Sequence, residues 1–410
     1  MGKNVLIGQS GGPTSVINAS LAGVVSVARQ HDDLTLYGMR NGIQGFLQGK
    51  YINVLDYVKT PEDLNLLMRT PSAFLGSCRY KLPSFTADEE VYKKIFEKLD
   101  ELDIGYFHYI GGNDSMDTIA NLSMYAEKIG RSDIKFIGIP KTIDNDLVIT
   151  DHTPGFGSAA KYIACSVKEL IRDNTVNDMD IVTVIEIMGR DAGWLTGAAA
   201  LSEGSDCSGP DLIYLPEMTF DVDKFIEKVS EIQKKRRSVI VCVSEGIMTA
   251  DGNYVCEYTS NASRSTDAFG HKQLTGTART LADIISMRLG CKVRAIEFSS
   301  LQRCAAHLQS KTDMEEAFKA GSFALNSALE GETGQLVIFE RVSDTPYDID
   351  LKLCDVRLVA NLKKDVPREW INEDGDYVTK EFRDYVRPLI MGEVEPIVED
   401  GLPRHICYIK

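Results

Sequence analysis

Two polar runs in this sequence combine residue types that could bind phosphate and move a proton. Residues 111–115 (GGNDS) and residues 140–146 (PKTIDND) each follow a short apolar stretch. Paired glycines let a backbone come close to an anion, and a helix N-terminus presents N–H groups to phosphate. Asp144 and Asp146 alternate, so an extended segment would turn both toward one side. One could take a proton from a hydroxyl while the other helps to hold Mg²⁺, and Lys141 could neutralise phosphate charge.

The elements around these runs should bring them to the same edge of a sheet. Residues 104–110 and 135–139 are expected strands, and residues 116–130 between them have the apolar spacing of a helix that ends at Gly130. Parallel βαβ crossovers are right-handed, so both polar runs should lie at the carboxyl ends of neighbouring strands, where open α/β sheets bind ligands. Each run alone is equally well explained as a turn or a solvated loop, and their combination is what favours a functional site.

Two more segments carry candidate phosphate ligands. A strand over residues 4–7 leads through residues 8–15 (GQSGGPTS) into a helix over residues 16–28. A glycine-rich turn between a strand and a helix can hold phosphate, although this one matches neither the Walker A nor the GxGxxG pattern and is weak evidence alone. Arg79 has the fork geometry for bidentate phosphate contacts, and a surface ion pair is its alternative interpretation.

The second half of the chain continues the alternation of strands and helices. The β-branched run 181–186 is typical of a buried parallel strand and leads into Met188, Gly189 and Arg190. Further strands are expected over residues 211–215, 238–244, 294–298 and 335–339, and helices over residues 158–173, 192–200, 222–236, 277–289 and 314–329. The tail beyond Pro367 is rich in charged and aromatic residues and is interpreted as an extension packed on the outside or at a subunit contact.

Composition limits the kind of partner. The 410 residues are 43% hydrophobic and 26% charged, which is ordinary for a soluble globular protein of two or three lobes. The net charge of −15 argues against nucleic acid or an anionic membrane as the main partner, so a site for phosphorylated substrates must build its own positive field. The sequence predicts no transmembrane span, secretory signal or transit peptide. Nine dispersed cysteines without a Cys-x-x-Cys pair indicate reduced thiols and a cytoplasmic protein.

The two polar runs resemble the signature loops of the phosphofructokinase family, and further loops resemble that family in the same order over most of residues 3–330. The resemblance implies an α/β fold with two doubly wound, Rossmann-like parallel-sheet lobes that face each other across a cleft. Residues 1–155 would form the lobe for the phosphoryl donor and Mg²⁺, and residues 156–305 the lobe for the phosphosugar. Residues 306–410 would add helices, a strand and a peripheral extension that pack back on the lobes.

The resemblance also implies an activity, which is transfer of a phosphoryl group to the 1-hydroxyl of fructose 6-phosphate in glycolysis, with Mg²⁺ as cofactor and a homodimer or homotetramer as the assembly. Asp144 would be the general base, Thr142 would orient the substrate, and Lys141 would stabilise the transferring group. The implied donor contacts are Gly11, Arg79, Gly112, Asp114, Ser115 and Lys141. The implied phosphosugar contacts are Thr142, Asp144, Met188, Gly189, Arg190, Glu245, Arg294, Ser300 and Arg303. The implied metal ligands are Asn113, Asp114 and Asp146, although the family commonly has an acid at the position of Asn113.

Two positions bear on the choice of donor. ATP-using members of the family usually carry glycine where this chain has Asp114 and Lys141, and this pair resembles the pyrophosphate-dependent branch. A side chain at Asp114 fills space that a nucleoside and its α-phosphate would need, and Lys141 places charge beside a small, highly charged donor. Pyrophosphate is therefore the predicted donor, in a reversible reaction. The alternatives are an ATP-dependent enzyme of the same fold, a catalytically silent regulatory subunit, and a different phosphosugar such as sedoheptulose 7-phosphate.

Overall fold

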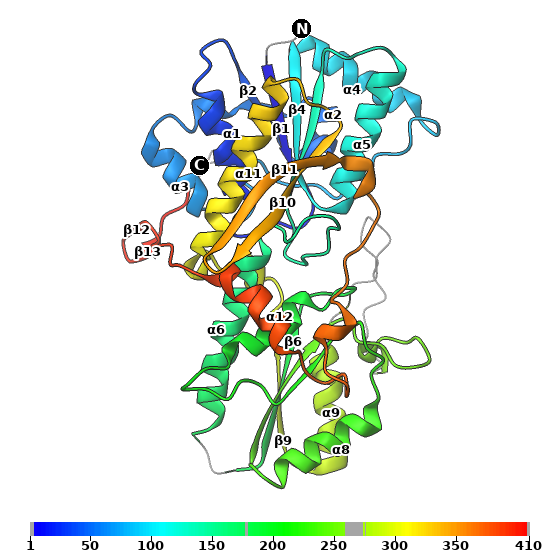
Figure 1. The fold of residues 1–410 in the computed structure, drawn as a ribbon, viewed down its shortest axis with the longest axis vertical. Helices are drawn as coiled ribbons and strands as arrows, with labels where there is room; N and C mark the ends of the chain where they lie inside the picture. The colour runs from blue at the N-terminus through cyan, green and yellow to red at the C-terminus, as the bar shows by residue number, and fades with distance from the viewer. Residues whose placement is uncertain (1–3, 177–178, 259–273, 275, 408–410) are drawn as a thin grey trace.

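The computed structural model describes residues 4–176, 179–258, 274 and 276–407. They form two lobes, one above the other in Figure 1, and each lobe has helices on both faces of a central sheet. The α/β fold with two parallel-sheet lobes predicted from the sequence is confirmed. None of the helices in the described ranges combines the length and apolar character needed to cross a bilayer.

The first lobe is built on a seven-stranded sheet in the order β11-β10-β5-β4-β1-β2-β3. Its strands are β1 (Asn4–Gln9), β2 (Leu36–Met39), β3 (Tyr51–Asn53), β4 (Ile104–Gly111), β5 (Lys135–Pro140), β10 (Gln335–Asp344) and β11 (Tyr347–Asp355). The inner strands are parallel, and β3 and β11 close the edges antiparallel to their neighbours.

Helices cover both faces of this first sheet because side chains alternate along its strands. The helices are α1 (Ile17–Ala28), α2 (Gly42–Leu47), α3 (Pro61–Arg69), α4 (Glu89–Glu101), α5 (Asn113–Lys128) and α11 (Lys311–Leu329). In β1, Leu6 packs with the α2, α4 and α5 side, whereas Val5 and Ile7 pack with the α1, α3 and α11 side. Both faces are therefore apolar, as the continuous hydrophobic character of the strands predicts.

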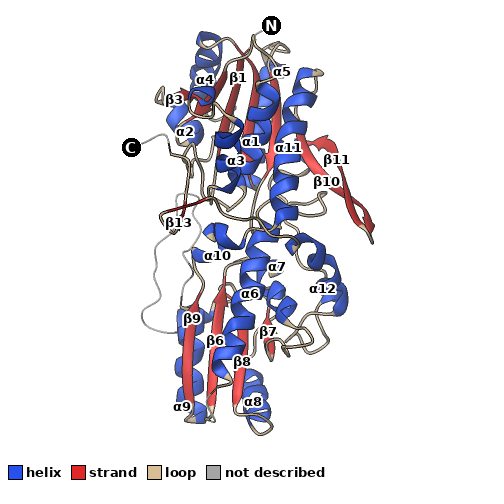
Figure 2. Cartoon of the chain, turned by 90° about the vertical axis from the view of Figure 1, so that its left-hand side faces the viewer, coloured by secondary structure: helices blue, strands red, loops and turns tan. Residues whose placement is uncertain are grey.

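The second lobe has a four-stranded parallel sheet in the order β7-β8-β6-β9. Its elements are β6 (Ile181–Ile187), β7 (Leu212–Tyr214), β8 (Ser238–Ser244), β9 (Lys292–Glu297), α6 (Phe156–Asn174), α7 (Trp194–Gly197), α8 (Val222–Gln233), α9 (Thr277–Leu289) and α10 (Leu301–Cys304). Val182 and Val184 of β6 pack with α8 and α9, and Ile185 and Ile187 pack with α6 and α7. The strands point toward the first lobe, so their carboxyl ends face it (Figure 2).

Several helices differ from the sequence prediction: α8 ends at Gln233 rather than at residue 236, and α11 begins at Lys311 rather than at residue 314. Helix α5 begins at Asn113 rather than at residue 116, so Asn113, Asp114 and Ser115 form its first turn after Gly112. Polar groups expected in a loop therefore project from a helix N-terminus, where backbone N–H groups have no partner within the helix. The single helix expected over residues 192–200 is the short α7 followed by a 3₁₀ helix, Ala198–Ser202.

The chain beyond residue 305 belongs to both lobes. Helix α11 and strands β10 and β11 complete the first lobe, with β10 beside β5. The following segment crosses to the second lobe, where α12 (Lys380–Val386) lies (Figure 1), and the chain then returns to a small hairpin of β12 (Val398–Glu399) and β13 (Leu402–Pro403). Trp370 and Phe382 pack against Trp194 of α7, with ring centroids 6.0 and 5.9 Å away. The aromatic tail expected on the outside thus contributes to the core of the second lobe.

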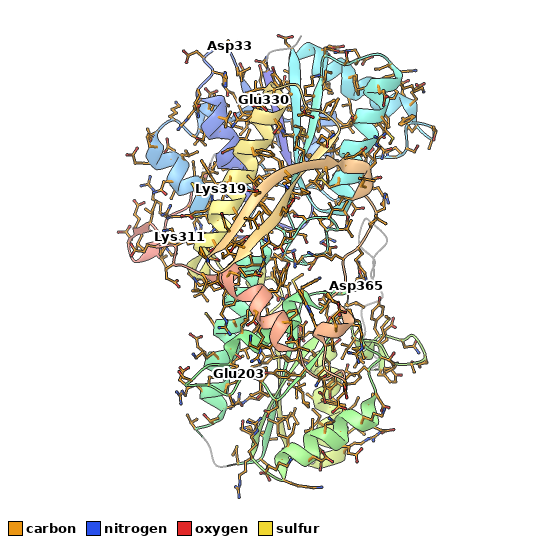
Figure 3. All side chains as sticks on the ribbon, in the orientation of Figure 1. Asp33, Glu203, Lys311, Lys319, Glu330 and Asp365 are labelled. Atoms are coloured by element: carbon orange, nitrogen blue, oxygen red, sulfur yellow. The ribbon has the colours of Figure 1, made fainter. Side chains whose placement is uncertain are left out.

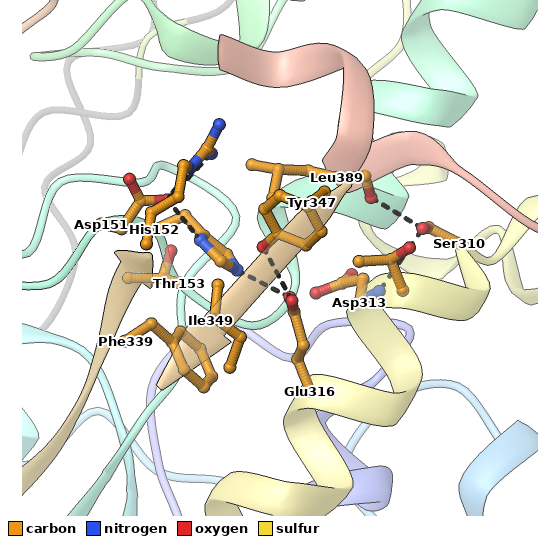
Figure 4. Close-up of polar contacts among 12 residues, drawn as sticks. Asp151, His152, Thr153, Ser310, Asp313, Glu316, Phe339, Tyr347, Ile349 and Leu389 are labelled. Atoms are coloured by element: carbon orange, nitrogen blue, oxygen red, sulfur yellow. Dashed lines mark hydrogen bonds and ion pairs between the residues drawn. The ribbon is translucent and has the colours of Figure 1, made fainter. Parts of the chain in front are cut away.

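A buried charged cluster lies where the chain passes from β5 to α6. The His152 side chain lies between two carboxylates, with Nδ1 2.8 Å from Asp151 and Nε2 2.7 Å from Glu316 (Figure 4). Burial alone would lower the pKa of His152, but Glu316 and Asp151 outweigh it and raise that pKa to about 9. Tyr347 donates to the Glu316 carboxylate at 2.7 Å, and the Phe339 ring stacks on the imidazole. A protonated His152 therefore ties the connection between the lobes to α11.

Candidate active site

A cavity of about 840 Å³ lies between the lobes, where the carboxyl ends of their strands meet. The first lobe contributes the segments after β1, β4 and β5, and the second lobe contributes the segments after β6, β8 and β9. The predicted site residues that line it are Gly11, Arg79, Gly112, Asn113, Asp114, Ser115, Lys141, Thr142, Asp144, Asp146, Met188, Gly189, Arg190, Glu245, Ser300 and Arg303. The fold therefore brings together residues that are far apart in the sequence, with Arg294 as the exception.

Cations gather at one end of the cavity although the chain as a whole is acidic. Lys141 is only 4% exposed, and its Nζ donates to the carbonyl oxygen of Gly12 at 2.7 Å. A Cβ on Gly12 would lie 3.1 Å from Nη1 of Arg303, so this second-lobe arginine reaches the first-lobe turn. Burial lowers the pKa of Lys141 to about 8, and the nearby Arg303 and Arg79 act in the same direction. An anion bound here would favour the charged form of Lys141, as a phosphate site requires.

Asp144 and Asp146 lie on the loop after β5, close to this lysine. Burial raises the pKa of Asp144, although Lys141 and Arg190 oppose the shift. Burial and the charge of Asp144 raise the pKa of Asp146 to about 7. The backbone N–H of Asp144 donates to Oγ1 of Thr142 at 3.0 Å, which fixes the start of the loop. A partly buried carboxylate with raised proton affinity is suited to act as a general base near neutral pH.

Three residues around the same loop offer oxygen atoms to a cation. Nδ2 of Asn113 donates to the Asp146 carboxylate at 3.4 Å, and the buried Oδ1 of Asn113 has no hydrogen-bond partner among the described residues. Asp114 lines the cavity beside them. Within the described ranges, no group of three or more His, Cys, Asp or Glu side chains is arranged to hold a metal. Mg²⁺ needs no such group, because it commonly takes one or two carboxylates together with water and substrate phosphates, so this sparse oxygen set fits it.

The opposite wall of the cavity is formed by the second lobe. Gly189 has a φ of +126°, a conformation that strongly favours glycine, and its N–H points at Oε1 of Glu245 at 3.4 Å. The guanidinium of Arg190 pairs with the Asp191 carboxylate at 2.7 Å. Burial and the nearby Asp144 raise the pKa of Glu245 to about 8. This wall thus presents a cation and a hydrogen-bonding carboxyl group to the cavity.

Arg294 is the one predicted site residue that does not line the cavity. It is the third residue of β9, in register with Thr183 of β6, and its Nη1 lies 3.2 Å from the Asp173 carboxylate. The cavity lies beyond the carboxyl ends of these strands, so this register keeps Arg294 away from it. The phosphosugar contacts implied for Arg294 and Arg303 are therefore not brought together within one chain.

The crossing segment after β11 contributes a part of the cavity wall that was not predicted from the sequence. Nζ of Lys363 donates to the Asp191 carbonyl at 2.8 Å and pairs with Asp365 at 2.6 Å; Figure 3 labels Asp365 between the lobes. The unpredicted lining residues are Ser10, Gly12, Glu186, Ile187, Asp191, Ala192, Leu274, Glu297, Ser299, Asn361, Leu362 and Lys363. Most of them flank predicted loops and could have been found as neighbours. Residues 361–363 carry no motif or periodicity, so no local signal identifies them.

Two α/β lobes with a cation-lined cavity and partly buried carboxylates between them have the architecture of a phosphotransferase. The sequence profile described as Phosphofructokinase matches residues 4–297, and the chain belongs to the phosphofructokinase family. The resemblance noted in the sequence is thereby confirmed.

Relatives match nearly the whole chain. It is 41% identical over 405 residues to the pyrophosphate–fructose 6-phosphate 1-phosphotransferase of Halomonas elongata, with 98% of this chain and 95% of that protein covered. It is 41% identical over 408 residues to the protein of the same name from Methylococcus capsulatus, with the same coverage of 98% and 95%. The crystal structure of a pyrophosphate-dependent phosphofructokinase from Nitrosospira multiformis superposes with a TM-score of 0.88 at 37% identity, covering 99% of this chain and 96% of that one.

Proposed function

We propose that this protein transfers a phosphoryl group from pyrophosphate to the 1-hydroxyl of fructose 6-phosphate, giving fructose 1,6-bisphosphate and phosphate. The observation that carries the proposal is that Asp114 and Lys141 line one cavity together with Asp144 and the arginines of the opposite lobe. Relatives that match almost the full length of this chain are named for this reaction. Because pyrophosphate cleavage is not strongly downhill, the reaction is expected to run in both directions.

The donor side of the cavity supports a small, highly charged donor. Lys141 is buried and is oriented by its hydrogen bond to Gly12, so its ammonium has little freedom to move aside. Asp114 stands in the first turn of α5, where a glycine would leave room for a nucleoside. Gly11 lies in the turn after β1 with a φ of +75°, which lets the backbone of that turn approach phosphate. Pyrophosphate is small enough to fit beside Asp114 and carries enough charge to pair with Lys141, whereas ATP would clash with the side chain of Asp114.

The acceptor side supports a phosphorylated sugar. Arg190 and Arg303 supply guanidinium groups for the 6-phosphate, and such groups bind phosphate in a bidentate manner. Glu245 is placed to accept or donate hydrogen bonds with sugar hydroxyls, since burial and Asp144 raise its pKa to about 8. The open backbone at Gly189 lets the sugar approach the strand end.

In the proposed step, Asp144 accepts the proton of the 1-hydroxyl. The oxygen of that hydroxyl forms the new bond to phosphorus, and the bridging P–O bond of pyrophosphate breaks to release phosphate. Lys141 stabilises the charge on the transferring group, and Thr142 keeps the loop in place through its contact with Asp144. Mg²⁺, held at Asn113, Asp114 and Asp146, would supply charge neutralisation for the donor phosphates. Catalysis of this kind consists mainly of positioning and electrostatic stabilisation.

The proposed reaction also implies a metabolic pathway, a cellular compartment and an assembly for this protein. The reaction belongs to glycolysis, and the protein would act in the cytoplasm as a homodimer or homotetramer. A reducing compartment agrees with the nine cysteines, all of which lie in the described part of the chain and are free thiols.

A coupled assay with fructose 6-phosphate and Mg²⁺, comparing pyrophosphate with ATP, tests the proposal directly. The expected result is turnover with pyrophosphate and none with ATP, together with phosphate-dependent conversion of fructose 1,6-bisphosphate in reverse. Turnover with ATP alone would overturn the assignment of the donor but leave Asp144 as the base. Absence of turnover with both donors would instead favour a regulatory subunit or another phosphosugar.

A further inference from the structure

Asn145 separates Asp144 and Asp146 in the loop after β5 (residues 141–151, here called the catalytic loop), and its side chain points away from the cavity that they line. It is fully buried and has a φ of +54°, so its backbone turns sharply between Asp144 and Asp146. Its Nδ2 donates to the phenolic oxygen of Tyr385 at 3.0 Å. Asparagine is among the few residues that adopt this left-handed conformation readily, and here its side chain also anchors the turn.

Tyr385 itself is held from several sides. It belongs to α12, and its hydroxyl donates to the backbone carbonyl of Asp151 at 2.5 Å. Its ring lies 5.4 Å from Trp194 and 5.2 Å from Trp370, and the Arg341 guanidinium lies 4.7 Å from it. Because aromatic packing fixes the ring, the hydroxyl is a rigid bridge between the turn at residue 145 and the connection at Asp151.

Lys364, on the crossing segment, holds the same loop from a second direction. Its backbone N–H donates to the Asp146 carbonyl at 2.8 Å, and its Nζ donates to the Asp151 carbonyl at 2.6 Å. Its own carbonyl accepts a hydrogen bond from the indole N–H of Trp194 at 2.9 Å. The C-terminal part of the chain therefore contacts the loop at residues 145, 146 and 151 and ties it to α7 of the second lobe.

We propose that Tyr385 is a positioning residue for phosphoryl transfer: through Asn145 it fixes the turn that aims Asp144 and Asp146 into the cavity. This inference rests on the proposed function of that cavity. Reactive groups must be held close to their productive geometry, and a misplacement of about 1 Å can cost about 100-fold in rate. Tyr385 does not line the cavity and acts on it through its hydrogen bonds to Asn145 and to the Asp151 carbonyl. Its loss should therefore lower turnover and leave substrate contacts intact.

The experiment compares Tyr385→Phe with Tyr347→Phe. Both changes keep the ring and remove a partly buried hydroxyl near the interlobe connection, but the Tyr347 hydroxyl donates to Glu316 at 2.7 Å and not to the catalytic loop. Tyr385→Phe should lower kcat about 10- to 100-fold, the range typical for residues that support metal ligands such as Asp146, with KM for fructose 6-phosphate within about threefold of wild type. Tyr347→Phe should keep the wild-type kcat, although both variants lower the melting temperature. Equal kcat values for the two variants would overturn the proposal.

A double-mutant cycle identifies the route of the effect. Asn145→Gly removes the amide but tolerates the positive φ, so Tyr385→Phe should cause little further loss of kcat in that background. Additive losses would show that Tyr385 acts by another route and would overturn the role of Asn145. The ratio of variant to wild-type kcat is measured with whichever donor supports turnover, so a wrong donor assignment leaves this test intact.

Hydrogen exchange provides a readout without turnover: residues 143–147 should exchange faster in Tyr385→Phe than in Tyr347→Phe, and identical exchange would count against the proposal.

Discussion

Gly246 packs so closely against the Arg190 backbone that no side chain fits there. A substitution at Gly246 therefore tests whether the second-lobe wall of the cavity binds the phosphosugar. A Cβ on Gly246 would lie 1.8 Å from the carbonyl oxygen of Arg190 and 2.7 Å from its Cα. Real Cβ atoms essentially never approach other atoms within 3.0 Å, so Gly246→Ala must separate the backbones of residues 246 and 190 by at least about 1.2 Å. The φ of Gly246 lies outside the left-handed region, so the substitution adds a clash and no backbone strain.

The expected consequence is a defect specific to fructose 6-phosphate. A displacement of about 1 Å can cost about 100-fold, which corresponds to about 2.7 kcal/mol of transition-state stabilisation. Steady-state kinetics of Gly246→Ala should therefore show kcat/KM for fructose 6-phosphate reduced about 100-fold, with KM for pyrophosphate close to wild type. Arg190→Gln should produce the same signature without a clash.

Gly321→Ala is the matched control. A Cβ on Gly321 would lie 1.9 Å from the carbonyl oxygen of Ser20, a clash of the same severity between α11 and α1, and neither residue lines the cavity. Overpacking of this kind costs about 1–3 kcal/mol of folding free energy. Both glycine variants should lose thermal stability, and only Gly246→Ala should lose kcat/KM for fructose 6-phosphate. A kcat/KM within threefold of wild type in stably folded Gly246→Ala would refute the proposed role of Arg190.

Three further outcomes are expected. Asp144→Asn should lower kcat by about 10²- to 10⁴-fold, the range for loss of a general base, while calorimetry still detects binding of fructose 6-phosphate; an unchanged kcat would remove Asp144 from that role. Asp114→Gly combined with Lys141→Gly should allow turnover with ATP in the coupled assay, and its continued absence would contradict the steric account of donor choice. Glu316 and a second carboxylate overcome burial and raise the pKa of His152 to about 9 in the folded protein. The resulting stabilisation, up to about 3 kcal/mol, should be fully present below pH of about 6.5 and lost as pH rises through about 9. Melting temperatures measured across this range should fall more steeply for wild type than for His152→Gln, and parallel curves would exclude the protonated cluster.

The sequence by itself determined the order of the elements and the residues at their ends. Strands β1, β4, β5, β6 and β8 begin within one residue of the predicted positions. Their apolar runs are short and their polar residues follow directly, so local pattern is sufficient to identify both. Parallel strands in one sheet present their carboxyl ends at the same edge, which is why Gly112 could be predicted to lie near Asp144 in the first lobe, and Arg190 near Glu245 in the second. That the two edges face each other was implied by the family resemblance.

Only the tertiary structure decided which predicted side chains reach the cavity and which other side chains hold them in place. Arg294 follows the strand pattern, but the register of β9 against β6 turns it to Asp173 and away from the cavity. The hydrogen bond from Asn145 to Tyr385 spans 240 positions of sequence. No periodicity in the chain encodes a contact of that span, because it depends on the path of the crossing segment and on the packing of α12 against the second lobe. The raised pKa values of Asp144, Asp146 and Glu245 have the same origin, since their desolvation depends on segments that only the fold brings around the cavity.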